Sequence, residues 1–180
     1  MTFHDTETPI PPDTLIVSKS DLAGRITYAN TALVKVSEYS ESELLGQPHK
    51  IFRHADTPKG VFHWFWQRLN DGHEVFAPVK NRTKSGGCYW VWAHVTPTWD
   101  NASGEVVGFH SSRRALPPQL RDAVEPLYAS MLEVEGATTD RKPSAEAGAR
   151  WLLSELATED WTGVERWFFE RINHTTENAA

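Results

Sequence analysis

Charged and hydrogen-bonding side chains are concentrated in residues 46–58, which read GQPHKIFRHADTP. This segment holds the imidazoles of His49 and His54, the guanidinium of Arg53 and the carboxylate of Asp56. Guanidinium and imidazole groups donate hydrogen bonds to acceptor groups, so a loop that presents this cluster could contact a ligand. The same side chains could instead form an ion-pair network that only orders the loop, with Asp56 orienting one of its neighbours.

The segment is bounded by two helix signals, which predict that it is a loop able to present its side chains. Ser40–Glu43 (SESE) has the pattern of a capping box before a short helix that ends at Gly46. Pro58 is typical of a helix start and precedes the aromatic stretch Lys59–Leu69. The chemistry-bearing residues therefore lie between two helices.

Alternating and β-branched stretches surround this helical middle and predict a sheet. The expected strands are Thr14–Lys19, Ile26–Ala29, Val75–Arg82, Cys88–Thr98 and Val106–Arg113. Two hairpins that flank a group of helices indicate an α+β fold, a five-stranded antiparallel sheet with helices on one face. Asn30 follows the second strand, where its amide can cap a helix, contact a ligand or do both.

The ends of the chain are expected to differ from this central domain. Residues 1–13 are predicted to be a disordered or loosely docked arm, 14–117 the α+β domain and 118–180 a helical extension. The extension is expected to contain helices Gln119–Val134, Ala145–Ala157 and Glu159–Ile172, a polar linker at Gly136–Pro143 and a cap at Thr158. Helices this short need a packing partner, since they are marginal alone in water.

Composition narrows the class of protein. The net charge of -6 argues against a nucleic-acid partner. No apolar run of membrane-spanning length and no signal-peptide core occur, so no membrane span is expected. The single cysteine, Cys88, excludes an intrachain disulfide framework and fits the reducing cytoplasm. Histidine spacings typical of metal sites are absent, as are Ser-His-Asp and paired-carboxylate patterns, so an enzyme is not expected.

Strand alternation separates two sheet faces. One face is small and mostly apolar and could line a pocket for a flat ring; its members are Val75, Ala77, Asn81, Val91, Ala93, Val95, Phe109 and Ser111. The other face carries Trp90, Trp92, His94 and His110. A bare surface of this kind is unusual for a soluble monomer. We therefore expect it to be covered by a second subunit, by the C-terminal helices or by the N-terminal arm, unless these tryptophans are ordinary core.

Residues 14–128 resemble the PAS domain of the bacterial aerotaxis-receptor family, which binds FAD. Residues 46–58 are similar to the family's GQPH-x-x-x-RHPDMP segment, and further similarity covers Asp21-Leu22, Ile26–Asn30, Val79–Arg82, Tyr89–Val91 and Val124–Tyr128. The resemblance implies a cytoplasmic sensory module that binds FAD and senses redox state or oxygen-linked electron flow, with a homodimer or a signalling protein as partner. The resemblance does not extend to residues 137–180.

The resemblance also implies which residues meet the cofactor. They are Asn30, His49, Arg53, His54, Asp56, Trp66, Asn81, Val91, Phe109 and Arg113. Trp64 and Trp66 lie on different helix faces, so only one can stack on a ring, and Trp66 matches the family tryptophan. Arg113 matches a family arginine and could stabilise negative charge on a reduced flavin.

The stretch Asn81–Gly86 is similar to the NYTKSG motif of light-sensing LOV domains, whose asparagine hydrogen-bonds the flavin pyrimidine edge. His49 occupies the position of the reactive LOV cysteine, so a thiol-adduct photocycle is not expected. Three other hypotheses remain open at this point. One is a haem-binding gas sensor that uses a histidine ligand, and another is a ligand-free PAS module that dimerises. The third is a small flavoenzyme, which would need a substrate opening beside the flavin ring and turnover with a reductant.

Overall fold

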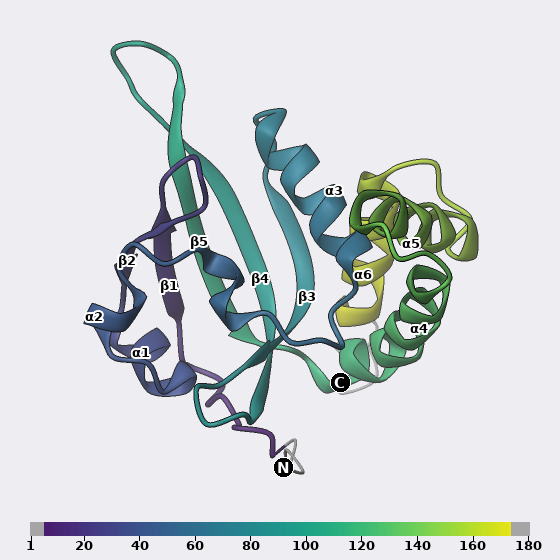
Figure 1. Ribbon diagram of the computed structural model, residues 1–180, viewed down its shortest axis with the longest axis horizontal. Helices are drawn as coiled ribbons and strands as arrows, with labels where there is room; N and C mark the ends of the chain where they lie inside the picture. Colours follow the sequence, from purple (N-terminus) through teal and green to yellow (C-terminus); the bar gives the residue numbers. More distant parts are fainter. Residues whose placement is uncertain (1–5, 174–180) are drawn as a thin grey trace. The chain divides into compact units, whose positions relative to one another are not determined.

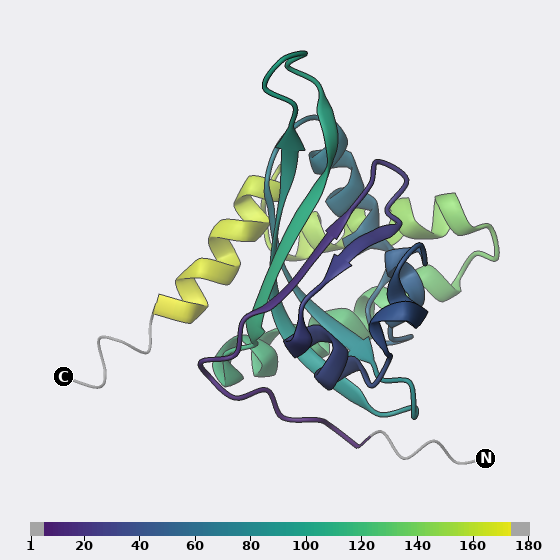
Figure 2. The ribbon, with the colours of Figure 1, turned by 90° about the vertical axis from the view of Figure 1, so that its left-hand side faces the viewer.

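The computed structural model describes residues 6–173 and contains one antiparallel sheet. Its strands are β1 (Ile16–Ser20), β2 (Ile26–Ala29), β3 (Val75–Arg82), β4 (Cys88–Trp99) and β5 (Val106–Ala115). They lie in the order β2-β1-β5-β4-β3, so the first hairpin joins the edge of β5 rather than that of β3 (Figure 1). Figure 2 shows β1 running alongside β5. The predicted α+β class and five-stranded antiparallel sheet are confirmed.

Register fixes which side chains share a face of the sheet. Ala93 pairs with both Ala77 and Arg113, and Ile16 pairs with Arg113. Because side chains alternate along each strand, these four residues point to one side, which we call the inner face. Val75, Val91, Val95 and Phe109 share this face and are buried. The two faces expected from alternation in β3, β4 and β5 are therefore confirmed.

Local sequence signals determine the short helices after β2. The Asn30 side chain accepts a hydrogen bond from the backbone N–H of Leu33 and caps α1 (Thr31–Ser37). Ser40 and Glu43 form the expected capping box of α2 (Glu41–Leu44). Gly46 follows with φ of 79°, a conformation that costs glycine little. The loop then forms η1 (His49–Phe52), a single 3₁₀ turn that the sequence patterns did not predict.

The chain separates into two compact units, which we describe individually. The first comprises residues 1–54 and 68–115 and contains the sheet, α1, α2 and η1. The second comprises residues 55–67 and 116–180. Helix α3 (Lys59–Asn70) contributes its first part to the second unit and its last residues to the first. The sequence-based boundary near residue 117 remains a prediction.

The second unit also contains α4 (Pro118–Gly136), α5 (Arg141–Glu155) and α6 (Trp161–Asn173). The predicted linker at Gly136–Pro143 was too long, because α5 begins at Arg141. Pro143 lies in its first turn, where a missing N–H removes no intrahelical bond. Thr158 is not the cap of α6; Asp160 accepts from the Gly163 N–H instead. Within residues 6–173, no helix is both long and apolar enough to cross a bilayer.

The described part of the N-terminal arm is docked on the first unit. Glu7 forms a parallel bridge with Cys88, where the Thr8 N–H donates to the Cys88 carbonyl at 2.8 Å. The Cys88 N–H donates in turn to the Thr6 carbonyl at 3.1 Å. Residues 6–8 are thus held by backbone hydrogen bonds at the start of β4, and residues 1–5 of the predicted arm lie outside the described residues.

Candidate functional site

A polar cluster lies on the inner face of the sheet, among otherwise apolar side chains. Arg113 comes from β5, Ser18 from β1 and His49 from η1. Two Arg113 nitrogens, Nη1 and Nη2, donate to Ser18 Oγ at 3.2 and 3.3 Å. Arg113 Nη2 also lies 3.0 Å from His49 Nε2, and Ser18 Oγ lies 2.8 Å from the same nitrogen. Three elements distant in sequence thus converge on one guanidinium.

The hydrogen bonds determine where the protons are. A guanidinium only donates, so His49 Nε2 accepts from Arg113 and its proton is on Nδ1. Ser18 Oγ accepts from Arg113 and can donate to the same Nε2. Desolvation and the nearby Arg113 charge lower the pKa of His49 to about 3. Although His49 as a residue is only half-buried, this edge of the ring faces two buried groups, so the imidazole is neutral at neutral pH.

Arg113 is a buried cation without a carboxylate partner among residues 6–173. Burial lowers the pKa of Arg113 to about 10, which leaves it charged at neutral pH. Its hydrogen-bond partners are neutral, since one is a hydroxyl and the other an imidazole. Burying an ion costs several kcal/mol, as an order of magnitude, and buried charges are normally paired. The arrangement therefore favours an anionic or electron-rich group beside Arg113.

Two further polar side chains lie on the inner face. Ser111 is 6% exposed, and its hydroxyl has no hydrogen-bond partner within residues 6–173. It pairs with Ser18 on one side and Val95 on the other. Tyr89 is buried, and desolvation raises the pKa of its phenol. An unpartnered buried hydroxyl on the same face as an uncompensated cation is consistent with a polar ligand.

Asn81 is the last inner-face residue of β3. It is 7% exposed, pairs with Tyr89 across β4, and forms an isolated antiparallel bridge with Arg53 just after η1. This bridge brings the loop of residues 46–54 to the strand that carries the predicted pyrimidine-binding amide. Arg53 and Asn81, which were predicted as separate candidates, are therefore neighbours.

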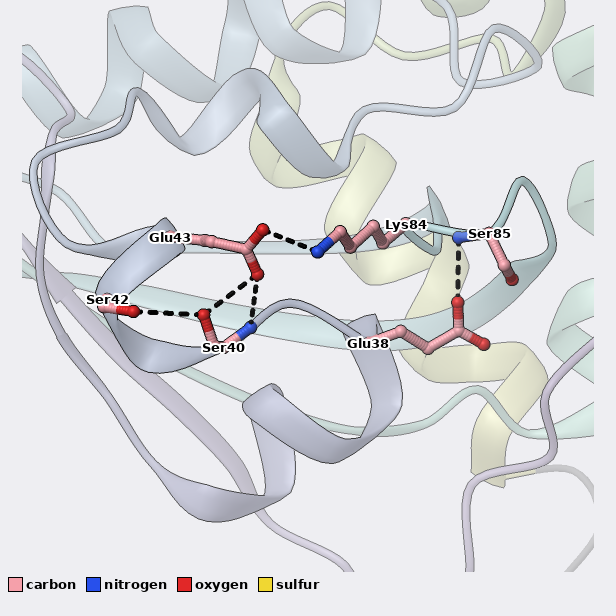
Figure 3. Close-up of polar contacts among 6 residues, drawn as sticks. All are labelled: Glu38, Ser40, Ser42, Glu43, Lys84 and Ser85. Carbon is pink, nitrogen blue, oxygen red and sulfur yellow. Dashed lines mark hydrogen bonds and ion pairs between the residues drawn. The ribbon is translucent and has the colours of Figure 1, made fainter.

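The turn that follows β3 is tied to α1 and α2 by the contacts in Figure 3. Lys84 forms an ion pair with Glu43, and the Ser85 N–H donates to the Glu38 carboxylate at 2.8 Å. The Lys84 hydrogen bond and those from Ser40 lower the pKa of Glu43 to about 2. Hydrogen bonds from Ser85 lower the pKa of Glu38. These exposed contacts fix the end of the strand that carries Asn81.

The structure brings together some of the predicted cofactor-binding residues and not others. His49 and Arg113 are in contact, Arg53 bridges Asn81, and Val91 and Phe109 lie buried on the same face. His54 follows Arg53 at the end of this loop. The amide of Asn30 is used internally, because Oδ1 accepts from Val17 and Leu33 while Nδ2 donates to the Leu15 carbonyl.

Asp56 and Trp66 belong to the second unit, which contains residues 55–67. Asp56 is exposed and Trp66 is half-buried. Trp64, the alternative to Trp66, stacks on Trp161 with ring centroids 6.3 Å apart. Because Trp64 already stacks on Trp161, Trp66 is still the preferred candidate to stack on a ligand ring. Its contact with a ligand remains a prediction.

Ser18 is the principal site residue that sequence reasoning missed. Strand β1 was predicted, but its face was not assigned, and Ser18 is completely buried beside Arg113. Alternation gave the available signal: Ile16, Ser18 and Ser20 share one side of a strand whose partner carries Arg113. Alternation in β1 points to Arg113 only once it is known that β1 pairs with β5.

The opposite face of the sheet carries an aromatic row. Phe76 stacks on His94 with centroids 4.1 Å apart and on Trp92 at 5.9 Å. His94 Nε2 lies 2.7 Å from a Glu74 carboxylate oxygen. Trp90 is 4% exposed, whereas Trp92, Phe76 and His94 are half-buried. In residues 6–173, no three histidine, cysteine or acidic side chains come together as a metal site.

The amino-acid sequence of the chain is similar to those of known proteins. The family described as the PAS fold matches residues 26–113. The aerotaxis receptor of Escherichia coli (strain K12) is 41% identical over 124 residues, which cover 69% of this chain and 24% of the receptor. The nitrogen fixation regulatory protein of Klebsiella pneumoniae is 28% identical over 107 residues, which cover 59% and 21%. The chain thus spans about a quarter or less of these relatives.

Solved structures share the fold at low sequence identity. A light-oxygen-voltage domain studied with a flavin analogue superposes with a TM-score of 0.57 at 18% identity, covering 65% of this chain and 88% of that domain. The dark structure of the blue-light photoreceptor Aureochrome1 LOV gives 0.54 at 15% identity, covering 67% and 86%. The sheet order, the helices between β2 and β3 and the family match agree that residues 26–113 form a PAS domain.

Proposed function

We propose that this chain is a cytoplasmic PAS sensory module that binds FAD noncovalently on the inner face of its sheet and reports the redox state of that cofactor. The observation that carries the proposal is the buried guanidinium of Arg113, whose hydrogen-bond partners among residues 6–173 are all neutral. Its support from relatives is the similarity to the aerotaxis receptor, together with a fold shared with a domain studied with a flavin analogue.

The donor set fits a flavin. The heterocycle of a flavin has a flat apolar body and one edge of carbonyl and imine groups. Small and apolar inner-face residues such as Ala77, Ala93 and Val91 suit the body, while Arg113, Ser111 and Asn81 offer donors for the edge. The unpartnered Ser111 hydroxyl and the uncompensated Arg113 charge are two separate features that such an edge would satisfy.

When bound, a flavin supplies reversible acceptance of electrons. In this chain Arg113 provides a fixed positive charge that favours added negative charge in its surroundings. Two unit charges 4 Å apart interact by about 4 kcal/mol at an effective dielectric constant near 20. His49 and Ser18 hold the guanidinium in place without neutralising it, since both partners are uncharged. A change of charge at the inner face therefore biases the hydrogen bonds of η1, which carries His49.

The haem hypothesis is less well supported by this geometry. A haem ligand would need a free imidazole nitrogen, yet His49 Nε2 already accepts from Arg113 and lies 2.8 Å from Ser18 Oγ. Coordination would break these contacts and bring an iron cation beside a guanidinium. His49 is therefore a poor haem ligand, and flavin is the preferred cofactor.

The experiment is an absorption spectrum of the purified protein, followed by identification of the nucleotide released on denaturation. Oxidised flavin bands and release of FAD are expected. Release of FMN would correct the cofactor, and a haem Soret band would replace the proposal with the gas-sensor hypothesis. No chromophore after incubation with FAD would favour a ligand-free interaction module.

We further propose that the module forms a homodimer through the half-buried row of Phe76, Trp92 and His94, with a signalling protein as a possible further partner. Stacked aromatic side chains are common anchors of protein interfaces. A Trp92→Glu variant would place a charge in this row and is expected to be monomeric in analytical ultracentrifugation. An unchanged mass would contradict the use of this face.

A further inference from the structure

Helices α4, α5 and α6 have no assigned role, yet they enclose the segment that directly follows the candidate ligand loop. Residues 49–54 belong to the sheet unit, and residues 55–67 belong to the helical unit. The two segments are consecutive in the chain, so residues 53–58 connect η1 to the start of α3. The residues that contact the start of α3 are therefore the ones that a movement of residues 53–58 would affect first.

Glu135, on α4, holds the start of α3. Its carboxylate is 1% exposed, and both oxygens are used: Oε2 accepts from the Lys59 N–H at 2.9 Å and Oε1 from the Gly60 N–H at 2.7 Å. These are among the N–H groups that have no partner within an α-helix. A carboxylate there also interacts favourably with the helix dipole. A buried side chain of one helix thus caps another helix more than seventy residues earlier.

Ser144 joins α5 to the same junction. Lys59 Nζ donates to Ser144 Oγ at 2.9 Å, and that hydroxyl donates to the Glu135 backbone carbonyl at 2.8 Å. Ser144 is completely buried. The first residue of α3 is therefore bound to α4 through its backbone and to α5 through its side chain.

Two glycines allow the helices to approach this closely. A Cβ atom on Gly60 would lie 2.6 Å from the Ala149 nitrogen, and one on Gly148 would lie 2.5 Å from Glu135 Oε1. One turn further along α3, Trp64 stacks on Trp161 of α6. The start of α3 is thus packed against all three C-terminal helices, and a Cβ atom at Gly60 would collide with the backbone of α5.

We propose that α4–α6 are the receiver of the sensor, and that Glu135 is the residue through which they detect movement of the ligand loop. The inference rests on the proposed function for the nature of the stimulus. Helix α3 is the connecting element, since its twelve residues contribute to both compact units. A change at His49 shifts residues 53–58, and Glu135 passes the resulting shift of the α3 start to α4 and α5.

The test is hydrogen–deuterium exchange of the full chain loaded with FAD, oxidised and after reduction with dithionite. In the wild type, reduction is expected to change exchange in residues 59–64 and in α4 and α5. Glu135→Gln replaces one acceptor oxygen by a donor, and roughly tenfold faster exchange at Lys59 and Gly60 is expected from loss of a charge-assisted bond. The redox response of α4 and α5 should be lost, while the flavin spectrum stays unchanged.

Matched variants make the result specific. Glu133→Gln, on the exposed side of α4, should keep the wild-type redox response. Ser144→Ala, which leaves the Glu135 carboxylate intact, should weaken the response without removing it, and it replaces Glu135→Gln if that variant does not fold. A redox response confined to the sheet unit, or one that Glu135→Gln leaves unchanged, would overturn the proposal.

A second exchange experiment, without ligand, tests this inference independently of the proposed function. His49→Ala in the cofactor-free chain alters the inner-face cluster, and faster exchange in α4 and α5 is expected if the receiver function holds. That change should be absent when Glu135→Gln is combined with His49→Ala. If no flavin binds, the proposed cofactor is wrong and this experiment alone decides: an unaltered α4 and α5 would overturn the receiver function.

Discussion

The Arg113 guanidinium lies 3.0 Å from His49 Nε2, so a permanent cation on β5 donates to an imidazole on the 3₁₀ turn η1. The contact forces the imidazole to be neutral and to accept, and it links the sheet to the loop of residues 46–54. Electrostatics at the inner face and conformation of the loop are therefore coupled through one hydrogen bond.

Removing the Arg113 charge should lower the reduction potential of a bound flavin. Arg113→Met is expected to lower it by roughly 45 mV, which corresponds to about 2 kcal/mol for a two-electron couple. Arg113→Lys should keep most of the wild-type potential, since it keeps the charge. Potentials are read from spectra during reductive titration. Arg114→Met, at the exposed neighbour on the other face, is the matched control, and equal potentials in both Met variants would contradict this role of Arg113.

Arg53 and His54, which follow η1, are expected to contribute to FAD affinity. Arg53→Ala and His54→Ala should each weaken FAD binding by roughly ten- to hundredfold, because a charge-assisted hydrogen bond is worth about 1.5–3 kcal/mol. Fluorescence titration with FAD measures the affinity, and circular dichroism checks the fold. Lys50→Ala removes an exposed cation from the same loop and should have little effect. Wild-type affinity in all three variants would assign the cluster to loop structure alone.

His49 should make the cofactor-free protein less stable in mild acid. Its folded pKa is lowered to about 3 from 6.5, so between these values the unfolded chain binds a proton that the folded chain does not. The free energy of unfolding therefore falls as pH decreases below 6.5, by at most about 1.4 kcal/mol per pH unit, until the folded imidazole also titrates.

Urea unfolding at pH 7.5 and pH 5.5 measures this term. His49→Gln should show a smaller loss of stability between the two values than the wild type, and the same substitution at exposed His73 is the matched control. If His49→Gln loses as much stability as the wild type, the imidazole is not held neutral by its surroundings.

The close helix junction should be sensitive to one added methyl group. Gly148→Ala is expected to lower the free energy of unfolding by about 1–3 kcal/mol, because its Cβ would lie 2.5 Å from Glu135 Oε1. Gly136→Ala, at the end of α4, meets no atom within 4 Å and should be neutral or stabilise by up to about 1 kcal/mol. Thermal or urea denaturation compares the two, and equal stabilities would contradict the packing at Gly148.

The features that could be predicted before the fold was known are those that depend on near neighbours in the chain. Alternation predicted β3, β4 and β5 and their two faces, because side chains in a strand point to opposite sides whatever the partner strand is. The Asn30 cap and the Ser40–Glu43 capping box were predicted for the same reason, since their hydrogen bonds close within one helical turn. The PAS resemblance indicated His49, Arg53, Asn81 and Arg113 before any contact was known.

Which of these residues are in contact depends on how distant segments of the chain pack together. Ser18 contacts Arg113 because β1 pairs with β5, and the Glu135 carboxylate reaches Lys59 because α4 packs on the start of α3. Both contacts join residues more than seventy positions apart, and no local propensity encodes them. The early start of α5 has the same origin in context, since Pro143 breaks a helix interior but not a first turn. Local sequence patterns determine where the helices and strands form. Which of them pack together depends on the burial of distant polar groups against one another.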